Sequence, residues 1–122
     1  MLNNLTIVGR LCADPDLKQT QSGIPVCSFR IAVDRNYMTD GKRETDFFDV
    51  VAWRGTAEFI CNYFAKGRMI ALNGRLQTRA WTDRDGKKRV SVEIVAEAAY
   101  FDDNKPQVEE KKGSKSSGRK AA

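Results

Sequence analysis

Hydrophobic and polar side chains alternate in five separate stretches of the first hundred residues. A period of two residues is typical of a β-strand with one buried face and one exposed face. The stretches predict strands at residues 5–11, 27–33, 45–53, 69–81 and from 89 towards 101. The segments between them are rich in Gly, Pro, Asp and Asn, which favour turns.

One stretch has helical spacing instead. A helix is predicted over residues 56–65, where apolar residues recur three and four apart at Ala57, Ile60 and Phe64. Thr56 can cap its start and Gly67 can end it. Residues 17–23 and 34–43 are polar and are expected to be loops, and Asp85-Gly86 predicts a hairpin turn.

The strand over 69–81 has two chemically different faces. Its even positions predict a core face and comprise Ile70, Leu72, Gly74 and Leu76. Its odd positions predict an outer face and comprise Arg75, Gln77, Arg79 and Trp81. In the last strand, Val90, Val92 and Ile94 are expected to point inward.

The strand over 45–53 also carries aromatic side chains on its outer face. Phe48, Val50 and Ala52 can fill a core, while Phe47, Val51 and Trp53 occupy the other face. A half-exposed antiparallel strand normally has a polar outer face. Either this strand is buried on both sides, for example at a subunit interface, or its outer rings meet a ligand.

The order of elements is three strands, one helix and two strands. Five strands in one small domain are expected to close on themselves, because an open sheet leaves edges unpaired. This order matches the OB-fold, an all-β, five-stranded Greek-key barrel that binds oligonucleotides across one face. We therefore expect one domain over residues 1–103. Residues 104–122 have almost no apolar side chains and are expected to form a disordered tail.

The net charge of +5 is distributed unevenly. Residues 104–122 hold six of the 21 basic residues and two of the 16 acidic residues, which leaves fifteen basic and fourteen acidic residues for 1–103. The expected domain is therefore nearly neutral. Any binding of phosphates must come from local segregation of charge.

Several function classes are excluded or disfavoured by composition. The chain has no histidine, no phosphate-binding loop and only three widely spaced cysteines, Cys12, Cys27 and Cys61. We therefore expect no enzymatic activity, no metal and no cofactor. The start of the chain lacks the features of a signal peptide and there is no long apolar run, so a cytoplasmic protein with no membrane partner is expected.

Flat rings next to guanidinium groups suit a ligand that is both anionic and aromatic. A nucleic-acid strand with unpaired bases has these properties. Three alternatives share the pattern: a single-stranded DNA binder, an OB-fold RNA-binding module and a protein adaptor that buries Phe47 and Trp53 in a partner.

The sequence also resembles the bacterial and phage single-stranded DNA-binding proteins over nearly all of residues 1–103. The segments that carry this resemblance are Asn4–Leu11 with Asp14–Leu17, Thr45–Trp53, Ala57-Glu58 with Tyr63–Gly67, and Gly74–Trp81. The resemblance implies an OB-fold, a homotetramer, and sequence-independent binding of single-stranded DNA during DNA replication, recombination and repair. It also implies association with the nucleoid.

The resemblance further implies roles for individual residues. Bases are expected to stack on Tyr37, Phe47, Trp53 and Trp81. Phosphates are expected to contact Lys18, Arg35, Arg54 and Arg79, and strand parity adds Arg10 and Arg75.

Two features depart from the family pattern. Family members usually end in a long linker and an acidic tip that recruits replication and repair proteins, whereas this sequence ends in Gly118–Ala122, which is basic. Recruitment of such partners is therefore not expected through a tip of this kind. Asp49 lies on the expected binding face and is expected to pair with a neighbouring arginine.

Overall fold

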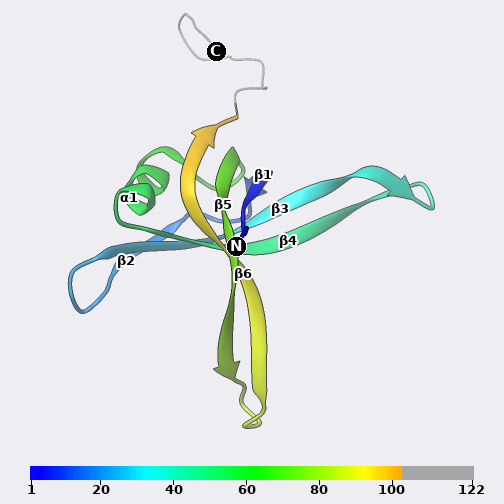
Figure 1. Ribbon diagram of the computed structural model, residues 1–122. Coiled ribbons are helices and arrows are strands. Elements are labelled where there is room, and N and C mark those ends of the chain that lie inside the picture. Colours follow the sequence, from blue (N-terminus) through cyan, green and yellow to red (C-terminus); the bar gives the residue numbers. More distant parts are fainter. Residues whose placement is uncertain (103–122) are drawn as a thin grey trace, which may run out of the picture.

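The computed structural model describes residues 1–102 and contains, within them, six strands and one helix (Figure 1). The elements are β1 (Leu5–Leu11), β2 (Asp16–Gln19), β3 (Pro25–Thr39), β4 (Lys42–Trp53), α1 (Arg54–Tyr63), β5 (Met69–Thr82) and β6 (Lys88–Phe101). The tail expected over residues 104–122 lies outside the described residues. Among those described, no helix has the length and hydrophobicity needed to cross a bilayer.

Five of the strands close into a barrel. Their order is β1-β5-β6-β4-β3, and β1 also pairs with β3 to complete the ring. Only β4 and β6 run parallel, and the other pairings within residues 1–102 are antiparallel. The helix stands between β4 and β5, as the pattern of elements predicts. This arrangement is the OB-fold expected from the sequence.

The core fills the barrel and the gap beneath α1. Its fully buried side chains include Leu11, Ile31, Ile60, Ile70, Leu72 and Ile94. Ala57, Ile60 and Phe64 all belong to this core, so the predicted apolar face of the helix is confirmed.

The predicted bounds and cap of the helix are wrong. α1 spans Arg54–Tyr63, its N-cap is Trp53, and no side chain caps it. The Thr56 hydroxyl lies within the first turn and donates instead to the Glu97 carbonyl of β6. Gly67 has a φ of 89° and lies in the loop after the helix, where its amide donates to Leu11.

Two predicted loops, residues 17–23 and 34–43, contain strand segments. Residues 16–19 pair with β3 as β2, although all four side chains are exposed and give no alternating pattern. The segment 34–43 consists of the ends of β3 and β4, joined by a tight turn at Asp40-Gly41, where both residues have positive φ. Backbone pairing to a neighbouring strand, rather than hydrophobic burial, forms these segments.

Two hairpins extend beyond the barrel. In Figure 1 the β3–β4 hairpin projects to the right and the β5–β6 hairpin projects downward. Leu76, Val90 and Val92 lie on the β5–β6 projection and are exposed, so their prediction as core residues is wrong. Their alternation is that of a buried strand, but the hairpin has already left the barrel at these positions.

Gly74 marks the point where β5 leaves the barrel. The register between β5 and β6 shifts here, because Asn73 faces Ala98 and Gly74 faces Ala96, which leaves Glu97 as a bulge. A Cβ atom at Gly74 would lie 2.0 Å from the Val95 carbonyl oxygen. Only glycine permits this close approach of the two backbones.

Candidate nucleic-acid interface

One face of the sheet carries side chains from β1 to β6 in rows set by strand register. Trp53 of β4 faces Val26 of β3, which in turn faces Lys18 of β2. Phe47 faces Ala32, which faces Arg10 of β1. Directly paired residues project from the same side of a sheet. Trp53, Phe47, Lys18 and Arg10 therefore share one face.

The same face continues onto β6 and β5. Asp49 of β4 faces Glu93 of β6, and Glu93 faces Gln77 of β5. Two and four residues further along β5, Arg79 faces Ser91 and Trp81 faces Arg89. The odd positions predicted to form the outer face of β5 are therefore on the side that carries Phe47 and Trp53.

The predicted stacking rings stand on the surface. Trp53 is 43% exposed, Trp81 is 42% exposed, Phe47 is 57% exposed and Tyr37 is 61% exposed. The Trp81 indole N–H donates to the Ser91 hydroxyl over 2.7 Å, which fixes the direction of that ring. None of these rings is part of the core, and each is at least two-fifths exposed.

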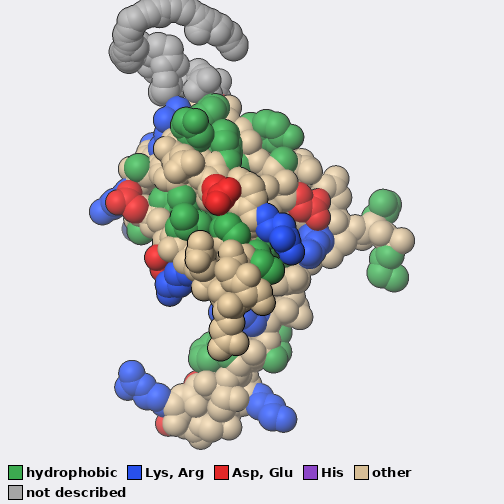
Figure 2. All heavy atoms as spheres, turned by 90° about the vertical axis from the view of Figure 1, so that its left-hand side faces the viewer, with side chains coloured by type: hydrophobic (Ala, Val, Ile, Leu, Met, Phe, Trp, Pro, Cys, Tyr) green, Lys and Arg blue, Asp and Glu red, His purple; other side chains and the backbone are tan. Residues whose placement is uncertain are grey.

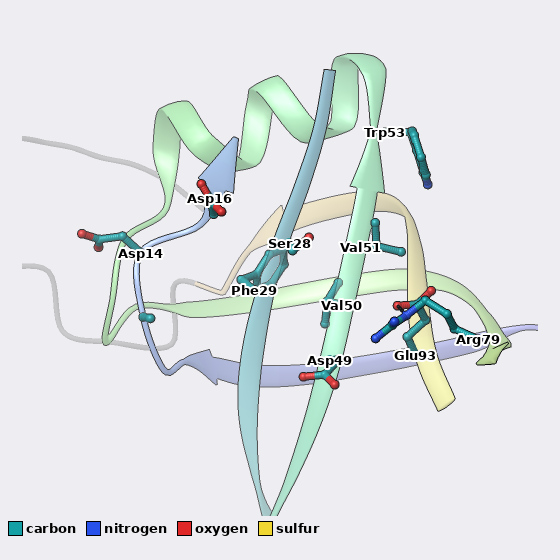
Figure 3. A pocket seen from close by; sticks show the side chains of 11 residues that line it. Asp14, Asp16, Ser28, Phe29, Asp49, Val50, Val51, Trp53, Arg79 and Glu93 are labelled. Carbon is teal, nitrogen blue, oxygen red and sulfur yellow. Dashed lines mark ion pairs between the residues drawn. The ribbon is translucent and has the colours of Figure 1, made fainter. Parts of the chain in front are cut away.

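A shallow groove of about 670 Å³ lies between the rows. Its lining includes Trp53 and Val51 of β4, Ser28 of β3, and Arg79 of β5. Figure 3 shows Trp53 at the end of β4 that joins α1, and Arg79 and Glu93 next to each other from β5 and β6. The groove therefore has an aromatic ring near one end and charged side chains on its floor.

Most of the predicted phosphate contacts are paired with carboxylates. The pairs are Lys18–Asp16 at 3.4 Å, Arg75–Glu97 at 3.4 Å, Arg79–Glu93 at 3.7 Å and Arg35–Asp46 at 3.0 Å. The expected partner of Asp49 is Arg30, whose Nε lies 3.1 Å from the carboxylate. Arg30 was not among the predicted site residues, although its even position in β3 places it on the same face as Asp49.

Arg35 is held on the β3–β4 hairpin by two acidic residues. Its guanidinium donates to both carboxylate oxygens of Asp46 and lies 3.3 Å from Glu44. The hydrogen bonds from Arg35 lower the pKa of Asp46, against a smaller effect of desolvation. The same contacts raise the pKa of Arg35. These contacts join Arg35 of β3 to Glu44 and Asp46 of β4 across the hairpin.

The remaining predicted residues are more dispersed. The Arg10 guanidinium donates to the Gly67 carbonyl over 2.8 Å. Arg54 follows Trp53 directly, with a φ of 57° and an exposed side chain. Tyr37 stands near the tip of the β3–β4 hairpin, away from the groove lining. The groove thus brings together Trp53 and Arg79, while the hairpins carry Tyr37, Arg35 and Trp81.

Further basic residues lie at the free ends of the hairpins. Lys42 and Arg43 begin β4, and Arg84, Lys87 and Lys88 surround the β5–β6 turn. Figure 2 shows Lys and Arg side chains at the lower end of the β5–β6 hairpin, and acidic and basic side chains interspersed on the body. Within residues 1–102, no group of three His, Cys, Asp or Glu residues could hold a metal ion.

Comparisons with known proteins agree with this geometry. Residues 2–102 match the model of the "Single-strand binding protein family". A "Single-stranded DNA-binding protein 2" of Listeria monocytogenes is 44% identical over 102 residues, which cover 83% of this chain and 64% of that protein. A "Single-stranded DNA-binding protein" of Oceanobacillus iheyensis is 45% identical over 102 residues, which cover 83% of this chain and 63% of that protein. One of Clostridium tetani is 44% identical over 101 residues, which cover 82% of this chain and 70% of that protein. The matched region is therefore less than two thirds of the length of the first two relatives.

Proposed function

Because this chain belongs to the single-strand binding protein family, we propose that it binds single-stranded DNA independently of sequence. In this role it protects unpaired strands during DNA replication, recombination and repair. The observation that carries the proposal is the placement of Phe47, Trp53 and Trp81 on one face of the sheet, each exposed and accompanied by arginines.

Base stacking on exposed rings supplies the first part of the affinity. Stacking of one base on an aromatic side chain contributes about 1–3 kcal/mol and tolerates every base, since all bases have a π face. Trp53 and Trp81 offer indole surfaces of this kind, and Phe47 offers a phenyl ring. A duplex is excluded from these contacts because its bases already stack on one another.

Neutralisation of phosphates supplies the second part. The predicted contacts are Lys18, Arg10, Arg35, Arg54, Arg75 and Arg79. Each phosphate contact releases counterions, so affinity should fall with salt, with a slope of about −0.7 per contact for single strands. Most of these lysine and arginine side chains are paired with carboxylates, which reduces their effective charge. Base stacking is therefore the larger contribution to affinity at high salt.

A homotetramer is the proposed working unit. The exposed apolar side chains Val8, Leu76, Val90 and Val92 support it, because burial of such residues between subunits is favourable. We further propose that the protein acts in the cytoplasm, associated with the nucleoid, and is a binding protein without catalytic activity. Single-stranded DNA is its primary partner.

The proposal is tested by tryptophan fluorescence. Titration with oligo-dT should quench Trp53 and Trp81 emission, and the affinity should fall between two salt concentrations. A duplex of the same length should not compete. Equal competition by poly-U would favour an RNA-binding module, and the absence of any quenching by either polymer would favour a protein adaptor. A mass measurement by light scattering tests the tetramer.

A further inference from the structure

Two carboxylates lie next to each other on the floor of the groove. Asp49 of β4 and Glu93 of β6 are register partners on the parallel strands, and both line the groove. Like charges opposite each other destabilise a sheet. They also have the wrong sign for a surface that attracts a polyanion, so their position requires an explanation.

Each carboxylate is balanced by an arginine from the flanking strand. Arg30 Nε lies 3.1 Å from Asp49, and Arg79 Nε lies 3.7 Å from Glu93. Gln77 also donates to Glu93 over 3.1 Å. The Glu93 side chain is only 14% exposed, so its carboxylate is largely enclosed by neighbouring residues of the groove. The charges of these two ion pairs sum to zero, and the other charged residues that line the groove, Asp14 and Asp16, are acidic. The groove therefore has no excess of positive charge.

The basic residues at the hairpin ends have a different environment. Lys42 and Arg43 at one tip, and Arg84, Lys87 and Lys88 at the other, form no ion pair with any residue in the range 1–102. Asp40 and Asp85 lie at the same two tips and offset only part of this charge. A net positive charge thus lies on the periphery of the face, and none lies at its centre.

We propose that Asp49 and Glu93 are specificity-determining residues that exclude phosphates from the groove floor. The sugar–phosphate backbone then runs along the periphery, and the uncharged bases face the sheet next to Trp53. Arg79, the predicted phosphate contact that lines the groove, stays paired with Glu93 in place of a phosphate. The two carboxylates would thereby distinguish a strand with unpaired bases from other linear polyanions. This inference rests on the proposed function and adds an account of how the groove selects bases over phosphates.

A simpler explanation is that the carboxylates only hold Arg30 and Arg79 in place, or only lower the total charge. In either case, neutralising one of them would change the binding of every polyanion by a similar factor. The exclusion of phosphates predicts instead that the change depends on whether the ligand has bases. The test therefore compares two probes that differ only in this respect.

The experiment uses Glu93→Gln and Asp49→Asn, each of similar shape to the original side chain. The probes are oligo-dT and an abasic deoxyribose-phosphate oligomer of the same length, at a salt concentration where both bind. The matched control is Glu58→Gln, which removes the same charge from an exposed position on α1, outside the groove. Thermal unfolding followed by circular dichroism checks the fold of each variant.

We expect each groove variant to bind the abasic oligomer roughly three- to tenfold more tightly, from the repulsion of one charge at close range in a partly screened site. Affinity for oligo-dT should change by less than about twofold, and Glu58→Gln should leave the ratio of the two affinities unchanged. An equal change for both probes, or no change, in the folded variants would overturn the inference while leaving single-stranded DNA binding intact. Failure of the unaltered protein to bind oligo-dT would overturn the proposed function itself.

Discussion

Replacement of Trp81 by alanine tests the stacking mechanism most directly. Trp81 stands on the β5 strand of the projecting hairpin, 42% exposed, and its indole N–H donates to Ser91. In the proposed function, removing the ring removes one stacking partner, which contributes about 1–3 kcal/mol. The dissociation constant for oligo-dT should therefore rise roughly five- to 150-fold.

The same substitution should have a limited effect on stability. A tryptophan side chain that is a little under half exposed buries on the order of 100 Å² here, which at about 25 cal/mol/Å² gives an upper bound near 2.5 kcal/mol. A domain of this size is stable by about 5–15 kcal/mol, so Trp81→Ala should remain folded. The ring packs within the hairpin and not in the barrel core.

The assay is fluorescence anisotropy of labelled oligo-dT at fixed salt, combined with thermal unfolding. Trp81→Phe is the matched control, because it keeps a smaller aromatic face and lacks the indole N–H that contacts Ser91. It should recover most of the affinity. The reasoning would be refuted if Trp81→Ala bound oligo-dT as tightly as the original protein, or if Trp81→Phe were as weak as Trp81→Ala.

Three further predictions concern the fold and its titratable groups. Gly74→Ala should destabilise the protein by about 3 kcal/mol or more, because its Cβ would meet the Val95 carbonyl and force the two backbones apart. Urea unfolding measures this change in the free energy of unfolding. A decrease below about 0.5 kcal/mol would contradict the prediction. Hydrogen bonds from Arg89 and from backbone amides lower the pKa of Asp83 below its usual 3.8, so this carboxylate stabilises the fold above that pH and loses its effect as the pH falls below it. Asp83→Asn should therefore lower the melting temperature at pH 7. It should also reduce the difference in melting temperature between pH 7 and pH 3, and an unchanged difference would count against a stabilising role for the Asp83 carboxylate. Burial raises the pKa of Cys27 to about 12, so iodoacetamide at pH 8 should label this thiol only after unfolding. Mass spectrometry of the peptide that contains Cys27 measures the labelling. Rapid labelling of the native protein would be inconsistent with the burial of this thiol.

The sequence predicts the barrel well because each barrel strand has one face in the core. Ile70 and Leu72 alternate with partly exposed residues, and Val50 and Ala52 do the same, so period-two patterns identify these strands. The placement of Trp53 on the outer face follows from the same parity. These features depend only on local alternation, which the sequence records directly.

Other features depend on which strands pair, and the sequence does not record this. β2 has no buried side chain, and its strand conformation comes only from backbone pairing with β3. Leu76, Val90 and Val92 have the alternation of core residues, yet they stand on a hairpin that has left the barrel. The side-by-side position of Asp49 and Glu93 arises from the parallel pairing of β4 and β6, two strands separated by the helix and by β5.

The length of the projecting hairpins can vary without affecting the hydrophobic core that stabilises the barrel. Beyond Gly74 on β5, every side chain up to Thr82 is partly or fully exposed, so this segment contributes little to the core. Lengthening both strands of such a hairpin by two residues would move its tip outward by about 6.6 Å and keep every ring on its original side. Under the proposed function, the number of nucleotides that one chain contacts could therefore change through small insertions and deletions in the hairpins, without any change to the barrel residues that determine stability.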